Sequence, residues 1–297
     1  MKNNSKIASI DCGSNSIKYR QYRWDNSNTL VLEDAKRLKI RLGSGAFSGH
    51  SSITNDVVGA IIEGFQKLGK RAQENSASIV RAVGTSALRS AENAKEICEI
   101  IRRDIGVEIT VLSGIEEARL LKYVQPEKAF KKNNCLVVDI GGGSTELYHA
   151  GTNKEFIRSI DLGAVRVMGN HDEASEWGSL KSTIDELNGE SIETVLGVGA
   201  NAKIAVGLSR ADNAPSASLD DLKTAGAYLA GVSVHNLSKE FSVSADRMEL
   251  APHAIKIWTV ILERLPYANL HVSKWTLCDG VIQQWLVDNN FSTCHIL

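Results

Sequence analysis

One short pattern occurs twice in this chain: an apolar run, an aspartate, then small residues that end in serine. The first copy is Asp11-Cys12-Gly13-Ser14-Asn15-Ser16 and the second is Asp139-Ile140-Gly141-Gly142-Gly143-Ser144. The two aspartates lie 128 residues apart, an interval that fits a whole domain. Glycine permits sharp turns and close approach of the backbone to a ligand, so each copy predicts a loop whose N–H groups bind an anion.

The segments around the two loops alternate between strand and helix patterns. Strands are expected at 7–10, 19–24, 29–32, 78–83, 107–112, 135–140, 145–149, 156–161, 194–196 and 271–277. Helical spacing of apolar residues indicates helices at 57–68, 91–103, 115–124, 202–208, 254–265 and 280–287. Strands followed by helices, twice over, predict an α/β protein made of two similar halves.

The domain boundary is expected in the polar stretch 125–134, which gives domains at 1–126 and 127–297. The last helix is expected either to remain with the second domain or to pack back on the first. Residues 41–45 are expected to form a turn-rich connection because two glycines and a serine fall together there.

Composition excludes several classes of protein. Hydrophobic residues make up 43% of the chain, enough for real cores, and a net charge of −1 does not fit a nucleic-acid-coating protein. The five cysteines form no Cys-x-x-Cys pair, and no apolar stretch approaches the roughly 18 residues of a membrane span. A strand pattern from Ile7 leaves no room for a signal peptide. A cytoplasmic protein without nucleic-acid or membrane partners is expected.

Four motifs occur in a fixed order and together resemble the exopolyphosphatase and guanosine-pentaphosphate phosphohydrolase (Ppx/GppA) family. They are Asp11–Ser16, Gly84-Thr85-Ser86-Ala87-Leu88-Arg89, Ser113-Gly114-Ile115-Glu116-Glu117-Ala118-Arg119 and 139–147, and Leu162-Gly163-Ala164-Val165-Arg166 also resembles a family segment. The resemblance covers nearly the whole chain. It implies two ribonuclease-H-like domains of the actin, sugar-kinase and heat-shock ATPase superfamily, with a phosphate site in the interdomain cleft.

The resemblance implies that Glu117 orients or deprotonates the attacking water. Hydrolysis of a phosphoanhydride needs a positioned water and neutralised oxygens, and a carboxylate within hydrogen-bond reach suits the first task. Glu116 is expected to cap or pair at the surface, because acidic residues are favoured in the first turn of a helix.

The resemblance also makes Asp139 and Glu146 metal-binding carboxylates, with Asp11 contributing from the other domain through water or loop geometry. Mg²⁺ is the expected ion, and Mn²⁺ the alternative, because Mg²⁺ keeps several waters and uses few protein ligands. Arg166 is a weaker phosphate-binding candidate than Arg89. The groups expected to bind phosphate are Gly13, Ser14, Asn15, Ser16, Arg89, Gly141, Gly142, Gly143, Ser144 and Thr145.

Two segments depart from the family pattern. The third glycine loop reads Gly197-Val198-Gly199-Ala200-Asn201, so Ala200 adds a methyl group where the backbone could need an unusual dihedral. Near the C-terminus, Cys278 stands where the family has an arginine. Both departures bear on substrate preference more than on hydrolysis.

The expected function is release of the terminal phosphate of inorganic polyphosphate, or of guanosine pentaphosphate. Without the further helical domains of long family members, processive action on long chains is less expected. Two alternatives stay open: a non-catalytic sensor that binds polyphosphate or guanosine tetraphosphate, and, less favoured, a small-molecule kinase of the same superfamily. A homodimer is expected by family analogy alone.

Overall fold

The computed structural model describes residues 5–25, 29–47, 52–124, 134–151, 155–209, 215–291 and 295–296. The chain divides into two compact units: unit 1 is Met1–Glu116 with Leu277–Leu297, and unit 2 is Glu117–Thr276. The expected boundary between residues 126 and 127 lies outside the described residues. The last helix belongs to unit 1, so of the two expected placements the structure shows the one in which it packs back on the first domain.

Unit 1 is built on a six-stranded sheet with the order β12-β3-β2-β1-β4-β5. Central strand β1 pairs antiparallel with β2 and parallel with β4. The strands are β1 (Lys6–Cys12), β2 (Ile17–Trp24), β3 (Thr29–Leu38), β4 (Ala77–Gly84), β5 (Ile109–Val111) and β12 (His295–Ile296).

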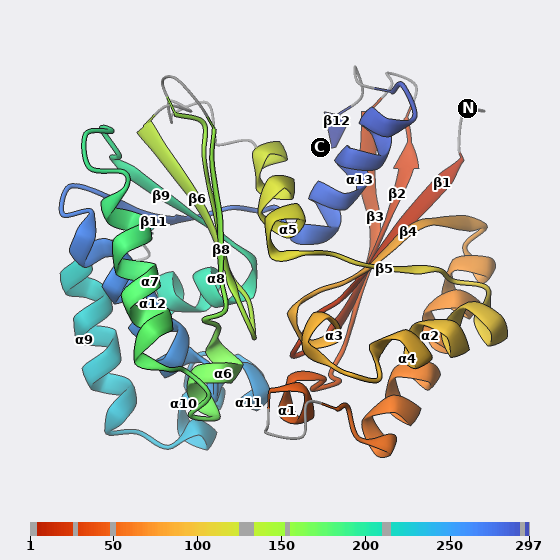
Figure 1. Cartoon of the computed structure of the whole chain (residues 1–297), viewed down its shortest axis with the longest axis horizontal. Coiled ribbons are helices and arrows are strands. Elements are labelled where there is room, and N and C mark those ends of the chain that lie inside the picture. The colour runs from red at the N-terminus through yellow and green to blue at the C-terminus, as the bar shows by residue number, and fades with distance from the viewer. Residues whose placement is uncertain are drawn as a thin grey trace. The chain divides into compact units, whose positions relative to one another are not determined.

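Helices cover both faces of this sheet (Figure 1). Helix α2 buries Ile61, Phe65 and Leu68, which recur at helical spacing as the sequence predicts. On the other face, Ile282 and Leu286 of α13 pack against Ile7 and other apolar residues of the sheet. The helices are α1 (Gly43–Ala46), α2 (Asn55–Glu74), α3 (Ser86–Ser90), α4 (Ala94–Ile105), α5 (Gly114–Leu120, which continues into unit 2) and α13 (Leu277–Asp288).

Unit 2 repeats this plan with a sheet of order β10-β11-β9-β6-β7-β8. Its central strand β6 pairs antiparallel with β7 and parallel with β9, as β1 does with β2 and β4. The strands are β6 (Cys135–Ile140), β7 (Thr145–His149), β8 (Phe156–Ile160), β9 (Thr194–Val198), β10 (Ser216–Ala217) and β11 (Asn269–Val272). The expected α/β fold of two similar halves is confirmed.

One of the helices of unit 2 carries Trp258, whose side chain is fully buried. These helices are α6 (Ala164–Met168), α7 (Ala174–Asp185), α8 (Gly199–Leu208), α9 (Leu219–Ala230), α10 (Val234–Glu240), α11 (Ala245–Met248) and α12 (Ala251–Arg264), with a 3₁₀ turn at Leu121–Tyr123. Across the described ranges, no helix combines the length and apolar character needed to cross a membrane.

Two sequence expectations about local structure are wrong. The strand expected at 271–277 ends at Val272, and α13 already begins at Leu277. The backbone N–H of Ser273 donates to the Gly197 carbonyl, after which the chain leaves the sheet, and Leu277 already belongs to unit 1. The turn-rich stretch 41–45 includes the start of a short helix, Gly43–Ala46.

Gly59 offers a simple test of helix α2. This exposed glycine lies inside the helix, and a Cβ added there would meet no atom within 4 Å. Gly59→Ala is therefore expected to raise the free energy of unfolding by about 0.5–1 kcal/mol, because alanine loses less backbone entropy in a helix. Denaturant unfolding measures the change, and a loss of stability would contradict the helix as described.

Candidate functional site

Both glycine loops close with the same hydrogen bond. The Gly13 N–H donates to the Ser16 carbonyl at 3.1 Å, and the Gly141 N–H donates to the Ser144 carbonyl at 2.9 Å. Each loop joins the central strand of its sheet to the antiparallel neighbour. The duplication seen in the sequence is therefore a duplication of loop geometry.

The two loops carry different charges at equivalent positions. In unit 1, Asp11 lies opposite Lys18, and the lysine Nζ is 2.8 Å from Asp11 Oδ2. In unit 2, Asp139 lies opposite Glu146, so two carboxylates occupy the same places. Asp11 is 2% exposed, and its Oδ1 has no hydrogen-bond partner among the described residues. That atom remains available to water or to the hydration shell of a metal.

The first loop is held by the segment that follows β3. The Gly43 N–H donates to the Ser14 carbonyl at 2.8 Å. The hydroxyl-bearing residues Ser14 and Ser16 are buried, whereas Gly13 and Asn15 are half-buried. The structure thus brings all four expected phosphate-binding residues of this loop together in one hairpin.

The end of β4 lies beside the first loop because β1 and β4 are parallel neighbours. Cys12 is paired with Gly84, and the Thr85 N–H donates to the Cys12 carbonyl at 3.3 Å. Ser86, which we did not predict as a site residue, is buried, and its hydroxyl has no partner among the described residues. The sequence could have indicated Ser86 as a site residue, because it follows the end of β4, which runs parallel to β1. Arg89 lies in α3 and donates to the Leu112 carbonyl at 2.8 Å.

Three carboxylates gather at the second loop. Glu146 is 1% exposed and Glu117, on α5, is 7% exposed. Burial raises the pKa of Glu146 well above its usual range, and the nearby charges of Glu117 and Asp139 raise it further. Ser159 donates to Glu146 Oε1 at 3.0 Å, and Ser144 also forms a hydrogen bond with Glu146. Both bonds favour the charged carboxylate and lower its pKa, but burial and the neighbouring carboxylates have the larger effect.

The start of α6 fixes the shape of the second loop. The N–H groups of Ala164 and Val165 donate to the carbonyls of Gly141 and Gly142 at 3.0 and 2.7 Å. A Cβ on Gly163 would lie 2.5 Å from backbone atoms of the loop, so glycine is required there. These bonds use the carbonyls of Gly141 and Gly142 and not the N–H groups of the loop.

Two predicted phosphate ligands make hydrogen bonds that hold the second loop in the described conformation. Thr145 is fully buried and its hydroxyl donates to the Leu162 carbonyl at 2.5 Å. Arg166 Nε donates to the Gly143 carbonyl at 2.7 Å. Since a threonine hydroxyl has a single proton to donate, the Thr145 side chain positions the loop.

The third loop approaches the same carboxylates without strain at Ala200. Its left-handed residue is Gly199, with φ of 81°, and a Cβ there would lie 3.3 Å from Asp139 Oδ1. Ala200 lies inside α8, so its methyl group requires no unusual dihedral. Asn201 donates to the Ile140 carbonyl at 2.7 Å and ties the third loop to the second.

The cysteines near the first loop are buried. Cys12 and Cys278 have no exposed surface, and burial raises the pKa of Cys278 to about 12 and that of Cys12 well above its usual range. Neither thiol is available as a nucleophile. Beside Cys278, Asp279 accepts hydrogen bonds from Arg20 at 2.5 Å and Tyr22 at 2.6 Å, which fixes the start of α13 on the sheet.

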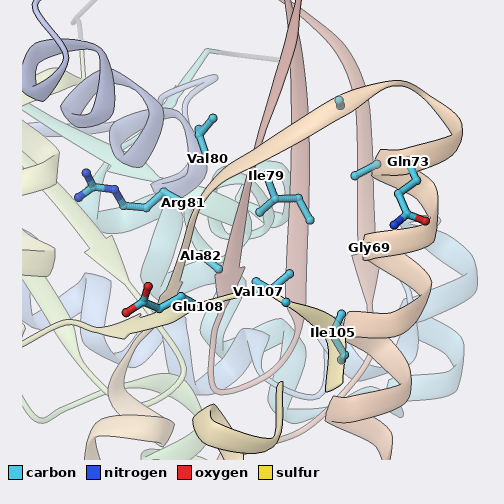
Figure 2. Close-up of a pocket in the computed structure, with 12 residues that line it drawn as sticks. Gly69, Gln73, Ile79, Val80, Arg81, Ala82, Ile105, Val107 and Glu108 are labelled. Carbon is cyan, nitrogen blue, oxygen red and sulfur yellow. The ribbon is translucent and has the colours of Figure 1, made fainter. Parts of the chain in front are cut away.

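A cavity of about 410 Å³ lies elsewhere on unit 1, among α2, the first half of β4 and residues 105–108. Figure 2 shows Gln73 on one side, Arg81 and Glu108 on the other, and Ile79, Ile105 and Val107 between them. Arg81 pairs with Asp288 at 3.0 Å. The cavity is lined by β4 residues between Ala77 and Ala82, whereas Gly84 ends the strand and Ser86 follows it beside the first loop, so the cavity lies away from that loop.

A family model for the Ppx/GppA phosphatase family matches residues 24–173, half of the chain. The chain belongs to the Ppx/GppA phosphatase family. A curated relative, the guanosine-5'-triphosphate,3'-diphosphate pyrophosphatase of Vibrio cholerae, is 32% identical over 165 residues, which are 55% of this chain and 33% of the relative. The chain thus spans about a third of the length of the curated relatives it matches.

Solved structures show the same fold. An exopolyphosphatase from Cytophaga hutchinsonii matches with a TM-score of 0.81 and 21% identity, over 96% of this chain and 98% of that one. The Ppx/GppA family member of Aquifex aeolicus matches with a TM-score of 0.74 and 23% identity, over 96% of this chain and 99% of that one. These Ppx/GppA structures share the two-domain actin-like fold.

The donor set at the second loop of this Ppx/GppA chain fits a hydrated divalent cation. Burial of Glu146 beside Glu117 and Asp139 leaves an excess of negative charge that a cation would neutralise. In the part of the chain that the structure describes, no three His, Cys, Asp or Glu side chains are arranged to enclose a metal. Mg²⁺ does not need such a cage, because it binds through one or two carboxylates, water and phosphate oxygens.

The crowding of carboxylates predicts a pH dependence of stability. The unfolded chain loses the Glu146 proton near pH 4.5, whereas the folded chain retains it to higher pH. Between the pKa of Glu146 in the unfolded chain and its higher pKa in the folded chain, the folded state binds more protons. The free energy of unfolding of the metal-free protein therefore falls as pH rises through this range. Glu146→Gln is expected to flatten this dependence. Denaturant unfolding across pH in chelator measures it, and an equally steep fall in the variant would contradict the assignment.

Proposed function

We propose that this chain hydrolyses the terminal phosphoanhydride bond of inorganic polyphosphate, with guanosine pentaphosphate as the second substrate to test. The observation that carries the proposal is the meeting of Glu117, Asp139 and Glu146 at a glycine loop whose N–H groups are not used by α6. The names of the relatives, a guanosine pentaphosphate pyrophosphatase and an exopolyphosphatase, support this choice of substrates.

In the proposed reaction, a water oxygen forms a new bond to the terminal phosphorus and the anhydride P–O bond breaks. Glu117 accepts the proton of the water, and the shortened chain leaves with the bridging oxygen. The N–H groups of Gly142 and Gly143 orient the phosphoryl oxygens. Asp139 and Glu146 would hold Mg²⁺, which offsets the charge that develops on those oxygens when it is bound.

The test is phosphate release from tripolyphosphate, long-chain polyphosphate and guanosine pentaphosphate, each with Mg²⁺, with Mn²⁺ and with chelator. Metal-dependent release from one of them would support the proposal and name the substrate. Absence of release from all three, in a protein whose melting temperature rises with the same compounds, would refute hydrolysis and favour a sensor.

A further inference from the structure

Strand β3 leaves most of one edge of the unit 1 sheet uncovered. Its inner edge pairs with β2 from Leu30 to Leu38, whereas β12 pairs only with Thr29 and Leu30 on the outer edge. Among the described strands, no other lies beside β3. The outer edge of residues 31–38 therefore meets no strand, and such an edge is a template on which a further strand can add.

The two halves of this outer edge carry opposite charges. The first half bears Glu33 and Asp34, and the second half bears Lys36 and Arg37. Exposed edges are commonly guarded by charged side chains, lysine above all, which discourage pairing with a second strand. A strand with both signs of charge does not repel every partner, so its charges select the partner and the direction of pairing.

A β-bulge places the two acidic side chains on one face of the sheet. The register with β2 shifts by one residue between Leu32 and Asp34, which makes Glu33 the extra residue. Asp34 lies opposite Gln21 of β2, and Gln21 also donates to Glu33 Oε2 at 2.8 Å. Lys36 follows Asp34 by two residues, so it lies on the same face as both carboxylates.

Contacts within unit 1 hold both carboxylates in place. Arg71 of α2 binds the two oxygens of Asp34 at 2.5 and 2.7 Å, and Lys6 Nζ lies 2.8 Å from Glu33 Oε2. Because these side chains are already ordered, they lose little conformational entropy when a further cation joins them.

Antiparallel pairing with the same edge of a second copy brings unlike charges together. With Ala35 of both copies at the two-fold axis, Asp34 and the bulged Glu33 lie opposite Lys36 of the second copy. The symmetry repeats this arrangement on the other side of the axis. Parallel pairing in register, or an antiparallel register centred on Lys36, would instead oppose like charges, which is destabilising.

The corresponding edge of unit 2 does not have this property. Strand β8 holds the place in its sheet that β3 holds beside β2 in unit 1. Antiparallel pairing of two β8 strands centred on their middle residue would put Arg158 opposite itself and Glu155 opposite Asp161. These are like charges, so self-complementarity belongs to the sequence of β3 and not to this position in the fold.

We propose that the outer edge of β3 is a dimerisation surface, on which a second copy of this chain adds its own β3 in the antiparallel direction, centred on Ala35. The inference does not depend on the proposed function, because neither glycine loop takes part. Strand pairing over residues 31–38 buries less surface than the roughly 1,200–2,000 Å² of a standard interface. We therefore expect a weak dimer with a micromolar Kd.

The test is sedimentation equilibrium of the whole chain, from low micromolar to several hundred micromolar concentration. We expect the wild type to pass from monomer to dimer. Lys36→Glu should raise the dimer Kd at least about tenfold, because it sets a like charge against Glu33 and Asp34. Lys181→Glu is the matched control, since Lys181 is exposed on α7 of unit 2, and it should leave the Kd unchanged.

A mixing experiment tests the register itself. Glu33→Lys should also weaken self-association, whereas an equimolar mixture of Glu33→Lys and Lys36→Glu should form a heterodimer in which unlike charges again face each other. Absence of the heterodimer from two folded variants would overturn the pairing centred on Ala35.

A wild type that stays monomeric at several hundred micromolar would overturn the inference, as would one Kd shared by the wild type and Lys36→Glu. Lys36 is exposed, so that variant should keep the wild-type melting temperature. If Glu33→Lys does not fold because Glu33 loses Lys6, Glu33→Gln replaces it. An unchanged Kd in both Glu33→Gln and Lys36→Glu would then overturn the inference.

Discussion

Glu117→Gln is expected to reduce phosphate release by about 10²- to 10⁴-fold. Glutamine keeps the shape of the side chain but cannot accept the proton of the attacking water. The variant should fold, because it removes a charge that now crowds Glu146. We expect its melting temperature in chelator to rise at neutral pH, while release of phosphate from polyphosphate falls.

Glu116→Gln is the matched control for this variant. Glu116 is exposed, and its carboxylate accepts a hydrogen bond from the Ser113 N–H at 2.7 Å while its own N–H donates to the Ser113 hydroxyl at 3.2 Å. This reciprocal pair is the cap expected for Glu116, and glutamine can keep it. Full activity in Glu116→Gln with loss in Glu117→Gln would assign the base. Full activity in both would remove Glu117 from the mechanism.

Gly163→Ala is expected to disrupt the second loop. The new Cβ would lie 2.5 Å from the carbonyl carbon and oxygen of Gly142 and from the nitrogen of Gly143. These are backbone atoms that cannot turn aside, so the loop must shift. Overpacking of this kind lowers the free energy of unfolding by about 1–3 kcal/mol, and misplacement of the loop N–H groups should reduce activity by a factor of about 10² or more.

Gly178→Ala provides the comparison for that measurement. Gly178 lies in helix α7 of the same unit, and a Cβ there would meet nothing within 4 Å. It should leave activity unchanged and slightly raise stability. If Gly163→Ala retains both wild-type stability and activity, the contact between α6 and the second loop is not as described.

The loops and their duplication could be predicted because each is local in sequence. An aspartate at a strand end followed by glycines constrains its own backbone, whatever the rest of the chain does. The pairing of Asp11 with Lys18 was also within reach, since a hairpin that joins Cys12 to Ile17 fixes the register of the next residues outward. The expected roles of Asp11, at the metal or in the geometry of the loop, do not include this ion pair.

Contacts between distant segments could not be found in this way. Nothing local to Gly163 indicates that its Cα faces the Gly142 backbone, and nothing local to Thr145 indicates that its hydroxyl bonds Leu162. The third loop shows the same limit, because the special dihedral belongs to Gly199 and not to the position of Ala200. The expected strand 271–277 failed because alternation also occurs where a chain leaves a sheet.

The return of residues 277–297 to unit 1 makes unit 2 an uninterrupted insert within a discontinuous partner. As the polypeptide leaves the ribosome, the sheet of unit 1 lacks β12 and the cover of α13 until residues 277–296 are made. Synthesis of the intervening segment 117–276 takes about ten to thirty seconds. During that interval Ile7, Tyr22 and Leu30 have no cover from α13. Unit 2 holds every residue of its own core once Thr276 is made, whereas unit 1 still lacks α13 at that point. Synthesis of unit 1 therefore begins before that of unit 2, and its core is completed after that of unit 2.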